Sequence, residues 1–504
     1  MKRIISVLCV LALSLTSFAA CSTADDTDAD DTTAAPATTA AEIESETEPV
    51  YTLGVPDELD YNGYTFRFLT NPGWNGTDAV QFTQFMYDEE NGDIFNDILY
   101  RRNQYVQEYL NIEFETQTHG GLTDVTAFRK AVNADDDSFD LGIWIDRFAL
   151  TLAQEGYVYS FNDLSSDSYI DTSNPWWLDD LNQTLTIDHK LFFAAGAYDM
   201  SIYGNIPMLL FNKDMAANLQ LDDMYDMVRN GSWTVDVMYD YMKRATADTN
   251  GNSEQDAEDR WGAVYIENFW NYSMSSGNDE YFIKKDENDL PYFAAPGNER
   301  LASICEAVAN MMSDPDYAIN VYDISSRYQL GHVYENVVTM FASGNALFAG
   351  AGTFYLNNLR DMKDEFGILP FPRIEKVEAG TPYTSWLCGV FGYIPPVNHD
   401  DPELISAVLE TLAYSSYHMV VPDYLNTVLQ LKQARDDDSA EMLDMMSKHF
   451  RIDLAQTYFL DMGISNIHSI FTDGEAKYAS TVEKYQKQIE KALEKVIDAF
   501  QELN

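Results

Sequence analysis

Residues able to carry acid–base or nucleophilic chemistry are abundant in this sequence, but they follow no catalytic pattern. The seven histidines are scattered, without the HExxH spacing of a zinc hydrolase. GxSxG, P-loop and GxGxxG motifs are absent as well. Because there are 82 acidic residues, a chance pair of carboxylates is easily assembled in space, which leaves glycoside hydrolysis open. We therefore expect no enzyme and keep a secreted glycoside hydrolase as an alternative.

One acidic turn has a spacing related to that of a calcium loop. Asp248, Asn250 and Asn252 occupy alternate positions, as the first ligands of an EF-hand do. Ser253 stands where that motif needs glycine, and Asp259 stands where it needs a bidentate glutamate. These departures favour a solvated turn, with a structural calcium ion as the alternative. We expect no other cofactor.

Aromatic side chains, 13% of all residues, are the other chemically useful group. A sugar ring offers its flat C–H face to an aromatic ring and its hydroxyls to carboxylates, amides and arginine. Large aromatic side chains bury ~150–250 Å² each, and a few convergent polar groups then fix the orientation of a ligand. Most such residues nevertheless pack in cores, and we expect packing roles for Trp144, Trp176, Trp177 and Trp233.

The elements that would position these residues alternate between strand and helix. Strands are predicted at 64–69, 112–114 and 140–146, with helices at 93–110 and 127–133 between them. This alternation is typical of a doubly wound, mostly parallel sheet, in which ligands sit beyond the carboxyl ends of the strands.

The N-terminus predicts export. Lys2 and Arg3 precede an apolar run that is too short for a comfortable membrane span, so residues 1–20 read as a signal peptide. The last residues before Cys21 resemble a bacterial lipobox, whose cysteine is lipidated; ordinary secretion is the alternative because Phe18 replaces the usual leucine. The residues that follow the signal peptide, 21–50, include nine acidic residues and no basic residue, which predicts an extended tether.

The charge balance excludes some partners. The net charge is −51, and it becomes −53 once the two basic residues of the signal peptide are removed. Such a chain is unsuited to nucleic acid or to electrostatic docking on anionic lipid. Beyond the signal peptide and Cys21, two cysteines remain, Cys305 and Cys388, and the sequence leaves open whether they form a disulfide or stay reduced.

A long stretch near the middle carries a family resemblance. Phe211-Asn212-Lys213 ends a predicted strand, and an acidic helix then leads to Gly231-Ser232-Trp233-Thr234. This combination resembles the crossover between lobes in bacterial extracellular solute-binding proteins of ABC importers, especially the carbohydrate-binding group. Further on, the apolar stretch 366–372 resembles the family's return strand.

The resemblance implies a two-lobe, periplasmic-binding-protein-like α/β fold of type II, with a cleft and a hinge between the lobes. We expect these parts: lobe 1 at 51–205, lobe 2 at 206–365, a return segment of lobe 1 at 366–420, and a C-terminal helical segment at 421–504 packed mainly on lobe 2. It also implies a monomer that is lipid-anchored on the extracellular face and delivers its ligand to ABC permease subunits.

The expected ligand is a sugar or oligosaccharide, and a peptide or another polar nutrient is the alternative. Candidate contacts are the residues that this fold would place at the cleft. They are Trp74, Asp146, Tyr198, Asp199, Trp270, Tyr355 and Trp386.

Overall fold

The structure is a computed structural model. The chain separates into two units, 1–50 and 51–504, and all residues that the structure describes belong to the second. The described ranges are 51–70, 84–92, 94–118, 120, 124–166, 168–312, 314–387, 389–430, 437–458, 466–467, 470 and 477–503. Cys21, Trp74 and Cys388 lie outside them, so the expectations for these three residues are not addressed by the structure.

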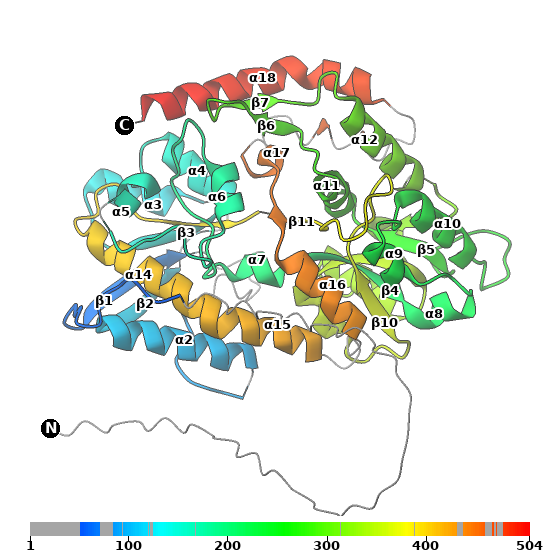
Figure 1. Ribbon diagram of the computed structural model, residues 1–504, viewed down its shortest axis with the longest axis horizontal. Coiled ribbons are helices and arrows are strands. Elements are labelled where there is room, and N and C mark those ends of the chain that lie inside the picture. Colours follow the sequence, from blue (N-terminus) through cyan, green and yellow to red (C-terminus); the bar gives the residue numbers. More distant parts are fainter. Residues whose placement is uncertain are drawn as a thin grey trace, which may run out of the picture. The chain divides into compact units, whose positions relative to one another are not determined.

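The first sheet has four strands in the order β12-β3-β1-β2. Strands β1, β2 and β3 are labelled in Figure 1. Strand β1 (Tyr64–Thr70) pairs in parallel with β2 (Ile112–Thr118) and β3 (Leu141–Ile145). Strand β12 (Phe391–Ile394) pairs antiparallel with β3. Helices α2 (Ile94–Leu110) and α3 (Thr126–Ala134) alternate with the strands, as the sequence predicts. Helix α4 (Asp146–Gln154) was not predicted, and Asp146, expected at the end of the third strand, is its first residue.

The second sheet has five strands in the order β10-β4-β9-β5-β8. Its strands are β4 (Pro207–Asn212), β5 (Trp261–Tyr265), β8 (Ala318–Asn320), β9 (Ala346–Gly352) and β10 (Phe366–Leu369). Strand β5 is parallel to β8 and β9, whereas β4 is antiparallel to β9 and β10. Both sheets are therefore mixed, because each carries antiparallel partners beside a parallel pair.

Helices accompany both sheets. Around the second they are α8 (Lys213–Asn218), α9 (Met224–Arg229), α10 (Val235–Ala245), α11 (Glu267–Gly277), α12 (Glu299–Met312) and α13 (Val333–Ala342). Between α4 and β4 lie α5 (Phe161–Ser166), α6 (Asp179–Leu185) and α7 (Met200–Gly204). Trp233 packs as expected: it is fully buried and its indole N–H donates to the Pro370 carbonyl at 3.0 Å.

The return to the first sheet comes later than the sequence suggests. Residues 366–369 form β10, which pairs with β4 and so belongs to the second sheet. The chain then runs through β11 (Ser385–Trp386), paired with β13 (Phe450–Arg451), and reaches the first sheet at β12. All four residues of β10 are buried. An apolar run of this kind predicts a buried strand but does not say which sheet receives it.

The C-terminal part contacts both halves of the protein. Helix α14 (Pro402–Ser415) continues through a π-helical turn (Ser416–Val420) into α15 (Val421–Gln430), and α14 packs on α2 of the first sheet. Within the described residues, Pro402–Thr427 is the one helical stretch long and apolar enough to cross a membrane, and 72% of its most apolar window is buried, as in a core helix.

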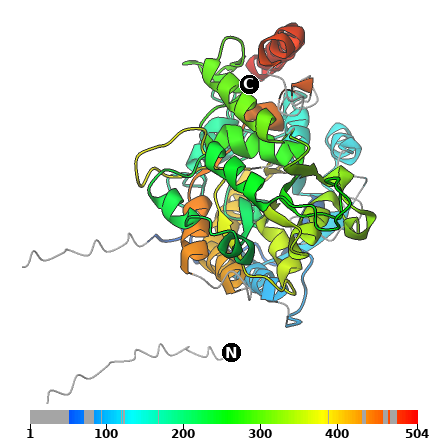
Figure 2. The same ribbon diagram turned by 90° about the vertical axis from the view of Figure 1, so that its right-hand side faces the viewer.

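The last helix, α18 (Tyr478–Glu502), lies beside the hairpin of β6 (Ile283–Lys285) and β7 (Pro291–Phe293), and also contacts α12 (Figures 1 and 2). Its far end reaches the segment before β4. There the Lys190 ammonium donates to the carbonyls of Phe500 and Leu503 at 2.5 and 2.7 Å. The expected packing on lobe 2 is thus only part of the arrangement, because α18 spans elements of both lobes.

Candidate functional site

Helix α11 presents an unusual concentration of aromatic residues, starting with Phe269. The Phe269 ring is buried and meets three other rings edge-on: Tyr334 at 5.8 Å, Phe371 at 5.9 Å and Trp386 at 6.0 Å between centroids. These partners come from α13, from the segment after β10 and from β11. Phe269 therefore joins three separate elements into one aromatic cluster.

Trp270, the next residue of α11, lies deeper. Its ring is 1% exposed and packs edge-on against Phe371 at 5.5 Å and Tyr265 at 6.2 Å. The backbone of β9 also approaches it closely, since a Cβ at Gly350 would lie 2.6 Å from the Trp270 Nε1 atom. Glycine at position 350 is thus needed for this indole to sit against the second sheet.

Trp386 and Tyr355 complete the cluster at its two ends. The Trp386 ring stacks on Tyr272 of α11, with centroids 5.2 Å apart and planes 16° from parallel. Tyr355 stacks on Tyr334 at 5.6 Å and 19°. Tyr355 belongs to the 3₁₀ segment Thr353–Leu359, which is fixed because the Thr353 hydroxyl donates to the Tyr203 carbonyl at 2.6 Å.

We call this group the aromatic site. Its members are Phe269, Trp270, Tyr272, Tyr334, Tyr355, Phe371 and Trp386. It contains three of the seven contacts predicted from the sequence, Trp270, Tyr355 and Trp386. Of its members, Tyr334 and Tyr355 are only partly buried, whereas the others are buried.

Polar atoms without partners lie along the same elements. Buried side-chain atoms with no hydrogen-bond partner include Trp270 Nε1, both amide atoms of Asn271, Ser273 Oγ, Ser385 Oγ and Trp386 Nε1. A buried polar group left unmet costs about 1–3 kcal/mol, so native proteins usually supply a partner or an ordered water. Several such atoms on α11 and β11 mark a place suited to a polar molecule.

The other three described candidates lie where the chain re-enters the first sheet. The N–H of Val390 donates to Asp146 Oδ2 at 3.2 Å, and the N–H of Phe391 donates to Asp199 Oδ2 at 2.8 Å. Asp199 also caps α7 through the N–H of Ser201. The Tyr198 hydroxyl donates to the Ala194 carbonyl at 2.6 Å. All three side chains are buried, their polar atoms contact protein backbone, and Asp199 also accepts the Ser201 hydroxyl at 2.7 Å.

Burial also perturbs the two carboxyl groups. It raises the pKa of Asp146 to about 7, and repulsion from Asp199 adds to this effect, against the backbone N–H groups and Arg147, which lower it. Burial likewise raises the pKa of Asp199 to about 6. The cost of dehydrating a carboxylate therefore outweighs the hydrogen bonds that it accepts.

Residues 88–413, more than half of the chain, match the family model of bacterial extracellular solute-binding proteins. The chain belongs to this family. It is therefore an extracellular solute-binding protein of ABC transporters, and a binding protein rather than an enzyme, as the sequence predicts. No curated protein matches it.

Solved structures confirm the two-lobe, periplasmic-binding-protein-like fold. The sugar-binding protein MalE from Xanthomonas citri aligns with a TM-score of 0.57 at 13% identity, covering 87% of this chain and 100% of that one. An ABC substrate-binding protein from Listeria monocytogenes in complex with cycloalternan aligns with a TM-score of 0.53 at 13% identity, covering 86% of this chain and 99% of that one. UgpB from Mycobacterium tuberculosis in complex with glycerophosphocholine aligns with a TM-score of 0.52 at 14% identity, covering 86% of this chain and 99% of that one.

The acidic turn of this solute-binding protein satisfies its own polar groups. Asp259 is buried and accepts the N–H groups of Thr249 and Asp256, at 2.8 and 2.9 Å. The side-chain amides of Asn250 and Asn252 donate to Asp256, so their N–H₂ groups point at the carboxylate. Among the residues described, no group of three or more His, Cys, Asp or Glu is arranged to hold a metal ion. The alternative of a structural calcium ion gains no support from this arrangement.

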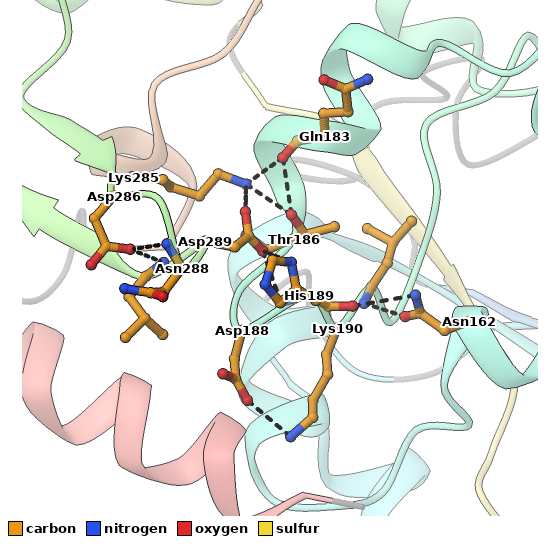
Figure 3. A network of polar contacts seen from close by, with 12 residues as sticks. Asn162, Gln183, Thr186, Asp188, His189, Lys190, Lys285, Asp286, Asn288 and Asp289 are labelled. Atoms are coloured by element: carbon orange, nitrogen blue, oxygen red, sulfur yellow. Dashed lines mark hydrogen bonds and ion pairs between the residues drawn. The ribbon is translucent and has the colours of Figure 1, made fainter.

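A second polar region joins the β6–β7 hairpin to the segment that follows α6 (Figure 3). The Lys285 ammonium donates to the Thr186 hydroxyl at 2.8 Å and to the carbonyls of Thr186 and Gln183, and it pairs with Asp289. Asp289 in turn accepts the His189 N–H at 2.9 Å. An open hollow of about 400 Å³ lies here, and one of about 270 Å³ lies beside it. Every cation of this region is paired, so we assign it a joining role between lobes.

Sequence reasoning missed much of the aromatic site. Phe269, Tyr272, Tyr334 and Phe371 were not singled out, although residues 269–272 show three aromatics in four positions. That density was the available signal. Asn271 was missed as well, since a polar residue among apolar neighbours is usually hydrogen-bonded within the fold.

Cys305 is buried in α12 with a free thiol.

Proposed function

We propose that this solute-binding protein captures a sugar or oligosaccharide and delivers it to the permease subunits of an ABC importer. The observation that carries the proposal is the aromatic site, a run of touching rings bordered by buried polar atoms that lack partners. Aromatic faces suit the C–H faces of sugar rings, and a small number of polar groups suit their hydroxyls. A peptide or another polar nutrient is the alternative ligand.

The predicted contacts take different parts in this proposal. Trp270, Tyr355 and Trp386 belong to the aromatic site and supply ligand contacts, with Trp74 as a further contact from outside the described residues. Asp146, Tyr198 and Asp199 hold the chain where it re-enters the first sheet, because their polar atoms are taken up by backbone groups. We further propose that Cys21 carries a lipid anchor at the extracellular face, and that the protein acts as a monomer.

Calorimetry tests the ligand. Maltotriose, cellotriose, mannotriose and a set of tripeptides would be titrated into the mature protein, followed by product analysis after long incubation. We expect binding of at least one glycan without turnover. Tyr355→Ala should weaken that binding at least tenfold, since truncating an aromatic contact in a binding site typically costs ~2 kcal/mol.

A matched control is Tyr322→Ala. Tyr322 is 70% exposed and lies outside the aromatic site, so its removal should leave affinity unchanged. Binding of tripeptides alone would replace the sugar by the alternative ligand. If Tyr355→Ala and Tyr322→Ala lose affinity equally, or if both keep the affinity of the wild type, the aromatic site is not where the glycan binds.

A further inference from the structure

The side chain of Asn271 is buried and makes no hydrogen bond within the fold. Its exposed fraction is 0%, and neither its amide oxygen nor its amide nitrogen has a hydrogen-bond partner. It lies between Trp270 and Ser273, whose polar atoms also lack partners. Helix α11 packs against β11, which brings Ser385 and Trp386 with two further unmet atoms.

A second buried asparagine, Asn278 at the C-cap of α11, does find hydrogen-bond partners within the fold. Asn278 is 1% exposed, one of its amide hydrogens reaches the Met274 carbonyl at 2.7 Å, and its amide oxygen accepts the N–H of Ile374 at 3.0 Å. At this position the fold thus supplies partners to both the amide oxygen and the amide nitrogen of a buried asparagine. An unmet asparagine costs stability, and such a cost is typical of a binding group.

The chemistry of the polar atoms without hydrogen-bond partners narrows the chemical class of the ligand. Two indole N–H groups only donate, the hydroxyls of Ser273, Ser276 and Ser385 donate or accept, and the Asn271 amide does both from adjacent atoms. None of these groups on α11 and β11 carries a charge. Arg373, two residues after Phe371, is also buried with an unpartnered Nε, but its guanidinium donates to the Pro382 carbonyl and lies over the Tyr383 ring. The neutral groups of α11 and β11 therefore favour an uncharged ligand, because a buried charge without a partner is costly.

We propose that Asn271 is the specificity-determining polar contact of the aromatic site. It recognises an uncharged ligand through a pair of neighbouring hydroxyls, one accepting from its amide nitrogen and the other donating to its amide oxygen. This inference rests on the proposed function, since it places the hydroxyls of a glycan at the aromatic rings.

The test compares Asn271→Leu, within α11, with Asn278→Leu, the same change at the C-cap of that helix. For Asn271→Leu we expect at least a thirtyfold loss of affinity for the glycan that the wild type binds best among maltotriose, cellotriose and mannotriose. The Tm of the ligand-free variant should equal or exceed that of the wild type, because two unmet polar atoms have been replaced by an apolar group. Asn278→Leu should lower Tm, with affinity within about threefold of wild type.

Three outcomes overturn the inference while leaving the proposed function intact. The first is that the wild type binds a glycan and the Asn271→Leu variant binds it equally well. The second is a ligand-free Asn271→Leu variant whose Tm falls as far as that of Asn278→Leu. The third is tighter binding of a galacturonate trimer than of the neutral trimers. If the wild type binds no glycan at all, the proposed function fails first and this inference fails with it.

Discussion

Two buried carboxyl groups, Asp146 and Asp199, hold the first residues of β12 through backbone N–H groups. Their pKa values, about 7 and about 6, lie above the ordinary aspartate value. The folded protein therefore binds more protons than the unfolded chain between about pH 4 and pH 7. Their contribution to stability is highest on the acidic side of this window, and it falls as pH rises through the two folded pKa values.

Asp146→Asn should reduce this pH dependence. The wild type is expected to lose about 2 kcal/mol of unfolding free energy between pH 5.5 and pH 7.5 through Asp146 alone, a share that the variant lacks. The measurement is the urea midpoint at the two pH values. Asp240→Asn is the control, since Asp240 is 65% exposed and should leave the pH difference as it is. An Asp146→Asn protein with the pH difference of the wild type would contradict the prediction.

Residue identities could be predicted from the sequence only in part. Trp270, Tyr355 and Trp386 were chosen from position and aromatic character, and the structure brings them into one cluster. Asn271 could not be found in this way, because whether a buried amide has a partner depends on residues distant in sequence, such as the Ile374 N–H that serves Asn278. The same holds for Asp146, whose partner Val390 is 244 positions away.

At the scale of elements, the β6–β7 hairpin contacts the segment that follows α6 through Lys285 and Asp289, a contact that we propose joins the two lobes. The Lys285 side chain is 17% exposed and donates to carbonyls at the end of α6, where a helix leaves its last carbonyl groups unmet (Figure 3). Lys285→Met should therefore cost about 1–3 kcal/mol. Hydrogen exchange should speed up together in residues 183–190 and 283–293.

Lys284 offers the matched control. It is the neighbouring residue, its partner is Glu280 at 2.8 Å, and its side chain is 32% exposed. Lys284→Met should change stability by less than about 1 kcal/mol, because a partly exposed ion pair contributes little. If Lys285→Met accelerates exchange only in the hairpin, the contact does not join the lobes.

Most elements could be predicted, because long periodic patterns are local. The strands near Tyr64 and Ile112 and the C-terminal amphipathic helix follow from alternation or from apolar spacings of three and four. The placement of β10 could not be predicted in the same way. Its four residues read as a buried strand in either sheet, and the choice depends on the register with β4.

At the scale of the whole molecule, the net charge of −51 leaves little electrostatic attraction to an anionic membrane. Retention at the cell surface then depends on the lipid that we propose at Cys21. Cys21→Ala should move the protein from the membrane fraction to the medium. The measurement is immunoblotting of the two fractions, with Cys305→Ala as a control that should stay on the membrane. A Cys21→Ala protein that remains membrane-bound would disprove the anchor.

The pairing of β12 with β3 also constrains the order in which parts of the chain can fold. The two strands are roughly 250 residues apart in the chain, so the first sheet must wait for a distant segment before it closes. Closing so long a loop costs conformational entropy before any contact between the two strands offsets that cost. Lobe 1 therefore cannot finish folding while the chain behind it is still incomplete. For a protein that acts outside the cell, we expect this delay to leave the chain unfolded for longer during its passage through the membrane.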